Sequence, residues 1–225
     1  LLHSRKGVNL PNTKISLPCL TKKDKKDLVF ILSEKIEWVG LSFVRSANDI
    51  KILKKIIDKQ KLHHKVIAKI EKPEAIKDID AIIDATDAIM VARGDLGVEV
   101  PPHKVPVHQK MIVEKCISQA KPVVIATQML ESMTENPIAT RAEVNDVANS
   151  VIDGVDAVML SGETSVGKHP LKVVDTMRKI IRDVEGSEHN ISKNKIIRPL
   201  TNNDRSLADA ICSSACDISE KTNAK

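Results

Sequence analysis

The sequence predicts an α/β protein, most specifically part of a (β/α)8 TIM barrel. Short runs of Val, Ile, Leu and Ala recur along the chain, and each is followed by a polar or glycine-bearing segment and then by an amphipathic helix. Continuous apolar runs suit parallel strands that are buried on both faces. Alternating strands and helices with short connections indicate a parallel sheet or a barrel. Five such units fill residues 38–185, whereas eight units need about 250 residues, so we expect only part of a barrel.

The five expected strands are short apolar segments that end in polar residues. They cover residues 39–44, 65–71, 88–92, 122–127 and 157–161. The chain begins at Leu1 rather than Met, and we therefore expect the three remaining units of the barrel to precede it.

Helices are expected between the strands because capping residues precede apolar residues at helical spacing. Thr21 and Ser46 can each cap a helix, and Pro73 suits the first turn of another. Thr140 and Glu143 form a capping box. The expected inner faces are Leu28, Ile31 and Leu32; Ile50, Leu53 and Ile57; Ile76, Ile79 and Ile83; Val144, Val147, Ala148 and Val151; and, in a last helix, Val174, Met177, Ile181 and Val184.

The composition becomes polar after residue 186, which predicts a domain boundary. We expect residues 12–187 to form the partial barrel. Residues 188–225 should hold a linker and the first helix of an α/β C-terminal domain, which begins near Asp204 and Leu207.

The formal net charge is +5. Many lysines, such as Lys51, Lys54 and Lys55, lie on the polar faces of expected helices, which favours a solvated surface over a nucleic-acid interface. Two Phe, one Trp and no Tyr leave few side chains to stack on bases. We therefore expect no nucleic-acid partner.

The four cysteines form no CxxC pair and have no disulfide-like spacing, which favours buried thiols over a metal site. They are Cys19, Cys116, Cys212 and Cys216. The sequence shows no signal-peptide pattern and no long apolar span, so we expect a cytoplasmic protein without a membrane partner.

Lys69 and Glu71 end the second expected strand. Residues two apart on a strand point to the same side, so the two side chains should project together. Burying such charges costs free energy unless they are paired. The pair is therefore either a structural ion pair or a cation donor beside a metal-binding carboxylate.

The third expected strand is followed by Arg93, Gly94, Asp95, Leu96 and Gly97. Glycines beside an aspartate allow a tight turn whose amides face an anion, and Asp95 would be a second oxygen ligand for Mg²⁺. A plain glycine turn is the alternative. An Arg-Gly-Asp adhesion motif is disfavoured because the segment directly follows a buried strand.

The last two expected strands also end in polar residues. Thr127 can hydrogen-bond a substrate at the mouth of the barrel, or it can cap a helix. Ser161 and Glu163 lie among Gly162 and Gly167, where a structural role is favoured over a phosphate loop. No GxGxxG, Walker, HExxH or nucleophile-elbow motif occurs.

Several segments together resemble the pyruvate kinase family. The resemblance runs in order over nearly the whole chain, and it rests on residues 5–11, 67–71, 90–97, 126–133, 140–143, 146–149 and 159–164. It implies strands four to eight of the barrel, with residues 1–11 returning from the small lid domain. The chain departs from the family pattern at His64 and Ala139, which lie outside the expected chemistry.

The resemblance also implies a reaction and its residues. It implies Mg²⁺-dependent phosphoryl transfer from phosphoenolpyruvate to ADP, which gives pyruvate and ATP in the last step of glycolysis. Lys69 would steady the phosphoryl group, and Glu71 and Asp95 would hold Mg²⁺ or Mn²⁺. The amides around Gly94 and Asp95 would bind the substrate carboxylate, and Thr127 would lie against its reacting end.

The resemblance places some functional parts outside these 225 residues. They are the first three strands, most of the nucleotide-contacting lid and the ligands of a K⁺ ion that the full-length enzyme would use. A homotetramer is implied for the full-length enzyme, and the isolated chain is expected to be inactive. Two alternatives stay open: a non-catalytic binding or assembly piece, and a lyase that acts on pyruvate enolates.

Overall fold

The computed structural model describes residues 18–187 and 207–222. The expected lid return at residues 1–11 and the boundary near residue 188 lie outside these ranges. The chain divides into two compact units, residues 1–195 and 196–225. The first contains all five strands of the described residues, and the second contains helix α11 (Leu207–Thr222).

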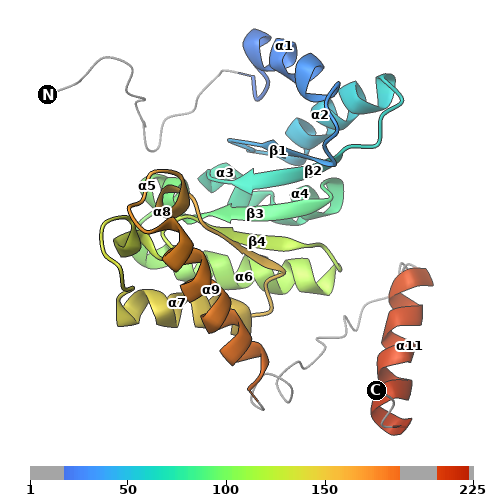
Figure 1. Ribbon diagram of the computed structural model, residues 1–225. Coiled ribbons are helices and arrows are strands. Elements are labelled where there is room, and N and C mark those ends of the chain that lie inside the picture. The colour runs from blue at the N-terminus through green and yellow to red at the C-terminus, as the bar shows by residue number, and fades with distance from the viewer. Residues whose placement is uncertain (1–17, 188–206, 223–225) are drawn as a thin grey trace, which may run out of the picture. The chain divides into compact units, whose positions relative to one another are not determined.

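Five parallel strands form one sheet in the order in which they occur along the chain (Figure 1). They are β1 (Trp38–Leu41), β2 (Lys65–Ile70), β3 (Ala88–Ala92), β4 (Val123–Ala126) and β5 (Ala157–Met159). A doubly wound sheet would reverse its strand order at a switch point. The sequential order is that of a barrel segment, which confirms the predicted partial (β/α)8 fold. Among the described residues, β1 and β5 each pair on one side only.

The helices alternate with the strands, as predicted. They are α1 (Lys22–Ile31), α2 (Ala47–Lys59), α3 (Pro73–Lys77), α4 (Ile79–Ala85), α5 (Arg93–Glu99), α6 (Val105–Ser118), α7 (Arg141–Ile152), α8 (Gly162–Ser165) and α9 (Pro170–Glu185), with single 3-10 turns η1 (Pro102–Lys104) and η2 (Glu131–Thr134). Thr21 and Thr140 cap α1 and α7 through capping boxes with Asp24 and Glu143, which satisfies first-turn amides.

The helix predicted to start at Pro73 is divided at Asp78. This residue leaves helical geometry (φ −103°, ψ 18°), and its Oδ2 accepts a hydrogen bond from the amide of Ala47 at 2.8 Å. The contact joins the start of α2 to the α3–α4 junction. The break therefore depends on a residue 31 positions away, which local spacing could not reveal.

The core lies between the sheet and a layer of helices. Helices α2 and α6 pack on the sheet with α4 between them, and they cover Val66, Ala68 and Ile70 of β2, which are fully buried. The other face of the sheet carries Ile67 and Lys69. That face is only half-buried, as expected where further strands would close a barrel.

The buried face of α9 differs from the prediction. Its buried residues are Val173 and Met177, whereas Val174, which was expected on the inner face, is 52% exposed.

Cys116 is buried as predicted, and burial raises the pKa of its thiol to about 12. Cys212 and Cys216 on α11 are exposed, so the prediction of buried thiols is wrong for them.

None of the helices in the described part of the chain combines the length and hydropathy that a membrane span requires.

Candidate active site

The carboxyl ends of β2, β3 and β4 lie side by side at one edge of the sheet. Ile70 of β2 is paired with Val91 of β3, and Ala92 of β3 is paired with Ala126 of β4. Because the strands are parallel, the residues that follow them emerge at the same edge. In barrels of this kind that edge carries the functional side chains.

Lys69 and Glu71 meet at the end of β2. The Lys69 Nζ lies 2.8 Å from the Glu71 Oε1 and donates to the Ser42 Oγ at 3.0 Å. The Glu71 side chain is 2% exposed, whereas that of Lys69 is 27% exposed. The predicted shared side of the strand is therefore confirmed, and the ammonium is the more accessible of the two groups.

Phe43 holds the second oxygen of Glu71. Its amide donates to the Oε2 at 2.7 Å, and its backbone has a positive φ of 54°. This left-handed conformation ends the extended segment, so β1 stops at Leu41 instead of the predicted Val44. The position of Glu71 thus depends on Phe43 in a left-handed backbone conformation, which a bulky residue such as phenylalanine rarely adopts.

Asp95 occupies the first turn of α5, where a tight turn was predicted. Its side chain is exposed. Glu99, one turn later on the same helix face, accepts from the Lys72 Nζ at 2.6 Å. This ion pair orients that face of α5 toward the end of β2. Within the described part of the chain, no hydrogen bond or ion pair joins Asp95 to Glu71 or Lys69.

Glu71 and Asp95 are carboxylates, the ligand type that a magnesium ion prefers in proteins. Mg²⁺ commonly takes one or two carboxylates, and water and substrate oxygens complete its shell. In residues 18–187 and 207–222, no group of three or more His, Cys, Asp or Glu side chains could hold a metal.

Thr127 and Gly94 are joined directly. The Gly94 amide donates to the Thr127 Oγ1 at 2.7 Å, and the hydroxyl donates to the Ala126 carbonyl at 2.6 Å. Thr127 therefore caps the first turn of α5, a helix from another part of the chain. A hydroxyl has two lone pairs, so one remains for a further contact.

The backbone after β4 is left-handed at two consecutive residues. Thr127 has a φ of 70° and Gln128 a φ of 55°, which costs about 1–2 kcal/mol for each residue. The guanidinium of Arg93 contacts the carbonyls of both and offsets part of this cost. Arg93 was not among the predicted site residues, although it directly follows a strand, where polar residues signal function.

Ser161 and Glu163 form a structural corner. Glu163 is fully buried and accepts from the amides of Ser161 at 2.8 Å and Leu130 at 3.3 Å. A Cβ at Gly167 would come within 2.2 Å of the Glu163 carbonyl oxygen, so the turn leaves room for glycine only. These contacts support the structural role that was favoured over a phosphate loop.

A cavity of about 550 Å³ lies beside the site rather than at it. Its walls are mainly apolar residues of α1 and β1, including Leu28 and Leu41, but Ser42, Phe43 and Lys72 reach it from the site. The charged groups and contacts above mark the functional edge better than this apolar hollow does.

Comparison with known proteins identifies the family. A family model described as "Pyruvate kinase, barrel domain" matches residues 1–174. The chain belongs to the pyruvate kinase family. The pyruvate kinase of Corynebacterium efficiens is 50% identical over 222 residues, which cover 99% of this chain and 45% of the relative. The pyruvate kinase of Mycobacterium tuberculosis is 49% identical over 220 residues, which cover 98% of this chain and 45% of the relative.

A clostridial relative gives the same result. The pyruvate kinase of Clostridium acetobutylicum is 44% identical over 224 residues, which cover 97% of this chain and 47% of the relative. The chain thus spans about half the length of the curated pyruvate kinases it matches. The structure joins Lys69 to Glu71 and Gly94 to Thr127, and it places Asp95 at the same edge of the pyruvate kinase barrel segment.

Proposed function

We propose that this chain forms strands four to eight of the catalytic barrel of a pyruvate kinase. The full-length enzyme would transfer the phosphoryl group of phosphoenolpyruvate to ADP and give pyruvate and ATP. The observation that carries this proposal is the 2.8 Å pair of Lys69 and Glu71, at the carboxyl end of a barrel strand beside those that lead into Asp95 and Thr127.

Lys69 is proposed to act on the phosphoryl group. Phosphoryl transfer is chiefly a matter of positioning and of neutralising charge on oxygens. The Lys69 ammonium is partly exposed and is fixed by two oxygen contacts, from Glu71 and Ser42. A cation held in this way loses little entropy when it binds a phosphoryl oxygen.

Glu71 and Asp95 are proposed to hold Mg²⁺, or Mn²⁺ in its place. When bound, the ion would act as a Lewis acid toward the enolate and carboxylate oxygens of the substrate. Glu71 is suited to this task because the Phe43 amide and Lys69 fix both of its oxygens. Asp95 is suited because its exposed carboxylate lies on the first turn of a helix at the same edge.

Thr127 is proposed to lie against the reacting end of the substrate, and Gly94 and Asp95 to orient the substrate carboxylate. The Gly94 amide donates to Thr127 in this structure. A substrate carboxylate at Gly94 would therefore share or displace that hydrogen bond. The Gly94 amide and the Thr127 hydroxyl, which are hydrogen-bonded to each other, would thus lie at the carboxylate and at the reacting end of the substrate, respectively.

The remaining features of the enzyme are proposed from its family alone. The full-length protein would be a cytoplasmic homotetramer that also uses K⁺, with the K⁺ ligands outside these 225 residues. Residues 1–11 would return from the lid, residues 12–187 would belong to the barrel, and residues 188–225 would lead into the C-terminal domain.

A coupled assay of ATP formation tests the proposal. The full-length protein should form ATP only when phosphoenolpyruvate, ADP and Mg²⁺ are all present. The 225-residue chain should form none, because three strands and the lid lie outside it. Consumption of phosphoenolpyruvate without ADP would favour the lyase alternative, and a full-length protein inactive in every combination would favour the non-catalytic one.

A further inference from the structure

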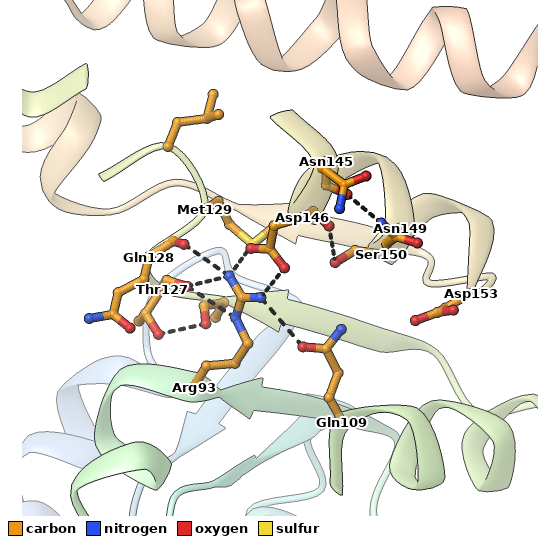
Figure 2. A network of polar contacts seen from close by, with 12 residues as sticks. Arg93, Gln109, Thr127, Gln128, Met129, Asn145, Asp146, Asn149, Ser150 and Asp153 are labelled. Carbon is orange, nitrogen blue, oxygen red and sulfur yellow. Dashed lines mark hydrogen bonds and ion pairs between the residues drawn. The ribbon is translucent and has the colours of Figure 1, made fainter. Parts of the chain in front are cut away.

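The turn that presents Thr127 is held from one side by a single arginine (Figure 2). Thr127 and Gln128 both adopt left-handed backbone conformations, which residues with a Cβ rarely adopt unless their surroundings hold them. The Arg93 Nη2 donates to the Thr127 carbonyl at 2.9 Å and to the Gln128 carbonyl at 3.0 Å. The same nitrogen lies 2.9 Å from the Met129 Sδ.

The Arg93 Nε also donates to the Thr127 carbonyl at 3.3 Å, whereas Nη1 is held by two other helices. The Nη1 pairs with the Asp146 Oδ1 on α7 at 2.7 Å and contacts the Gln109 Oε1 on α6 at 3.4 Å. The Arg93 side chain is only 11% exposed. The planar fork of an arginine can satisfy such diverging acceptors at fixed angles, whereas the single ammonium of a lysine cannot.

Arg93 and its neighbour Gly94 each donate a hydrogen bond to Thr127. Arg93 binds the backbone carbonyl, and the Gly94 amide binds the hydroxyl at 2.7 Å. A Cβ at Gly94 would lie 3.2 Å from that hydroxyl oxygen, so the spacing is already close. The start of α5 therefore fixes both the backbone and the side chain of Thr127.

We propose that Arg93, anchored by Asp146, is a positioning residue that sets the orientation of the Thr127 hydroxyl in phosphoenolpyruvate turnover. This inference rests on the proposed function. Arg93 touches no reacting atom in this account and acts only through Thr127. A displacement of about 1 Å in a reacting group can reduce a rate about 100-fold. Replacing the Arg93 guanidinium should therefore lower the rate of turnover measurably.

A double-mutant cycle in the full-length enzyme tests the proposal. The variants are Arg93→Lys, Thr127→Ala and the combination of both. Arg93→Lys should lower kcat about 10- to 100-fold and leave the KM for phosphoenolpyruvate nearly unchanged. In the Thr127→Ala background the same change should lower kcat less than about threefold, because residues that act as a unit are not additive.

Two further variants keep the test decisive. Asp146→Asn removes the anchor while Arg93 remains, and it should show the same non-additivity with Thr127→Ala. Arg178→Lys, which changes an exposed arginine on α9, should leave kcat and KM unchanged.

A purely structural arginine would give a different pattern. Its loss would lower the melting temperature, and Arg93→Lys would lower kcat by the same factor in the Thr127→Ala background as in the unmodified enzyme. That result would overturn the proposal. A normal kcat for both Arg93→Lys and Asp146→Asn would overturn it as well. If the unmodified enzyme formed no ATP from phosphoenolpyruvate, the proposed function would fail first, and the two failures are thus distinguishable.

Discussion

Lys69 and Glu71 point to the same side of β2, and the Lys69 Nζ lies 2.8 Å from the Glu71 Oε1. Glu71 is buried, and its other oxygen accepts the Phe43 amide. A buried carboxylate of this kind is stable only with such partners. Lys69 therefore compensates the buried charge of Glu71, and its ammonium lies at the edge where barrel enzymes bind substrate.

Lys69→Met should reduce turnover of the full-length enzyme by roughly 10²–10³-fold, as the loss of one transition-state donor does. The fold should persist with a lower melting temperature, because Glu71 loses its ion-pair partner but keeps the hydrogen bond from the Phe43 amide. The rate of ATP formation and the circular dichroism spectrum measure the two effects. Lys65→Met, at the exposed start of the same strand, is the matched control. A near-normal rate for Lys69→Met would remove the assigned role.

Glu71→Gln should weaken Mg²⁺ binding. The amide keeps one acceptor for the Phe43 amide but lacks the charge that attracts the ion, so the apparent Mg²⁺ dissociation constant should rise by at least about 10–100-fold, the range seen for lost outer-shell partners of metal sites. Titration with Mn²⁺ followed by electron paramagnetic resonance measures it. Glu114→Gln on the exposed face of α6 should bind Mn²⁺ like the unmodified protein, and equal affinities for both variants would contradict the account.

Glu143→Gln should destabilise the protein at neutral pH and much less in acid. Burial raises the pKa of Glu143, but hydrogen bonds from Ser132 and Thr140 outweigh burial and hold this pKa below its ordinary value. A lowered folded-state pKa stabilises the protein above the unfolded-state value of about 4.3, and that contribution is lost as the pH falls through the folded-state pKa. The difference in melting temperature from the unmodified protein should be steady from pH 7 to 5 and shrink below about pH 4.3.

The control for this pH dependence is Glu34→Gln, which changes an exposed carboxylate. Its difference in melting temperature from the unmodified protein should be small throughout. A gap for Glu143→Gln that widened as the pH fell would mean that the hydrogen bonds from Ser132 and Thr140 do not favour the charged form.

Ile125→Ala should lower the free energy of unfolding by about 2–5 kcal/mol. Ile125 lies in the middle of β4 with no exposed surface, so its loss leaves a cavity between the sheet and the helices. Urea unfolding measures the change. Ile138→Ala makes the same substitution at a side chain that is 77% exposed and should stay within about 0.5 kcal/mol. Equal losses at both positions would be inconsistent with the sheet–helix core.

The strands and most caps could be predicted from local sequence because each depends on residues close together in the chain. The five apolar runs became β1 to β5, and Thr21 and Thr140 cap the helices expected of them. Helix α5 was missed because Gly94 and Gly97 disfavour a helix locally. Tertiary contacts of Gly94 and Arg93, both in α5, with Thr127 override that preference.

The candidate site was only partly predictable for the same reason. The contact of Lys69 with Glu71 follows from strand periodicity, since the two residues are two positions apart. The contacts of Arg93 with Thr127 and Asp146 span 34 and 53 positions, and no local pattern encodes them. The left-handed Phe43 was hidden inside what reads as a continuous apolar strand.

Anomalous diffraction from crystals of the full-length enzyme grown with Mn²⁺ would locate the divalent ion that we propose Glu71 and Asp95 share beside Lys69. We expect one anomalous peak about 2.1 Å from a carboxylate oxygen of each residue, a distance typical of such ions. A Mn²⁺ peak bound elsewhere, with Glu71 and Asp95 turned to separate regions, would contradict it.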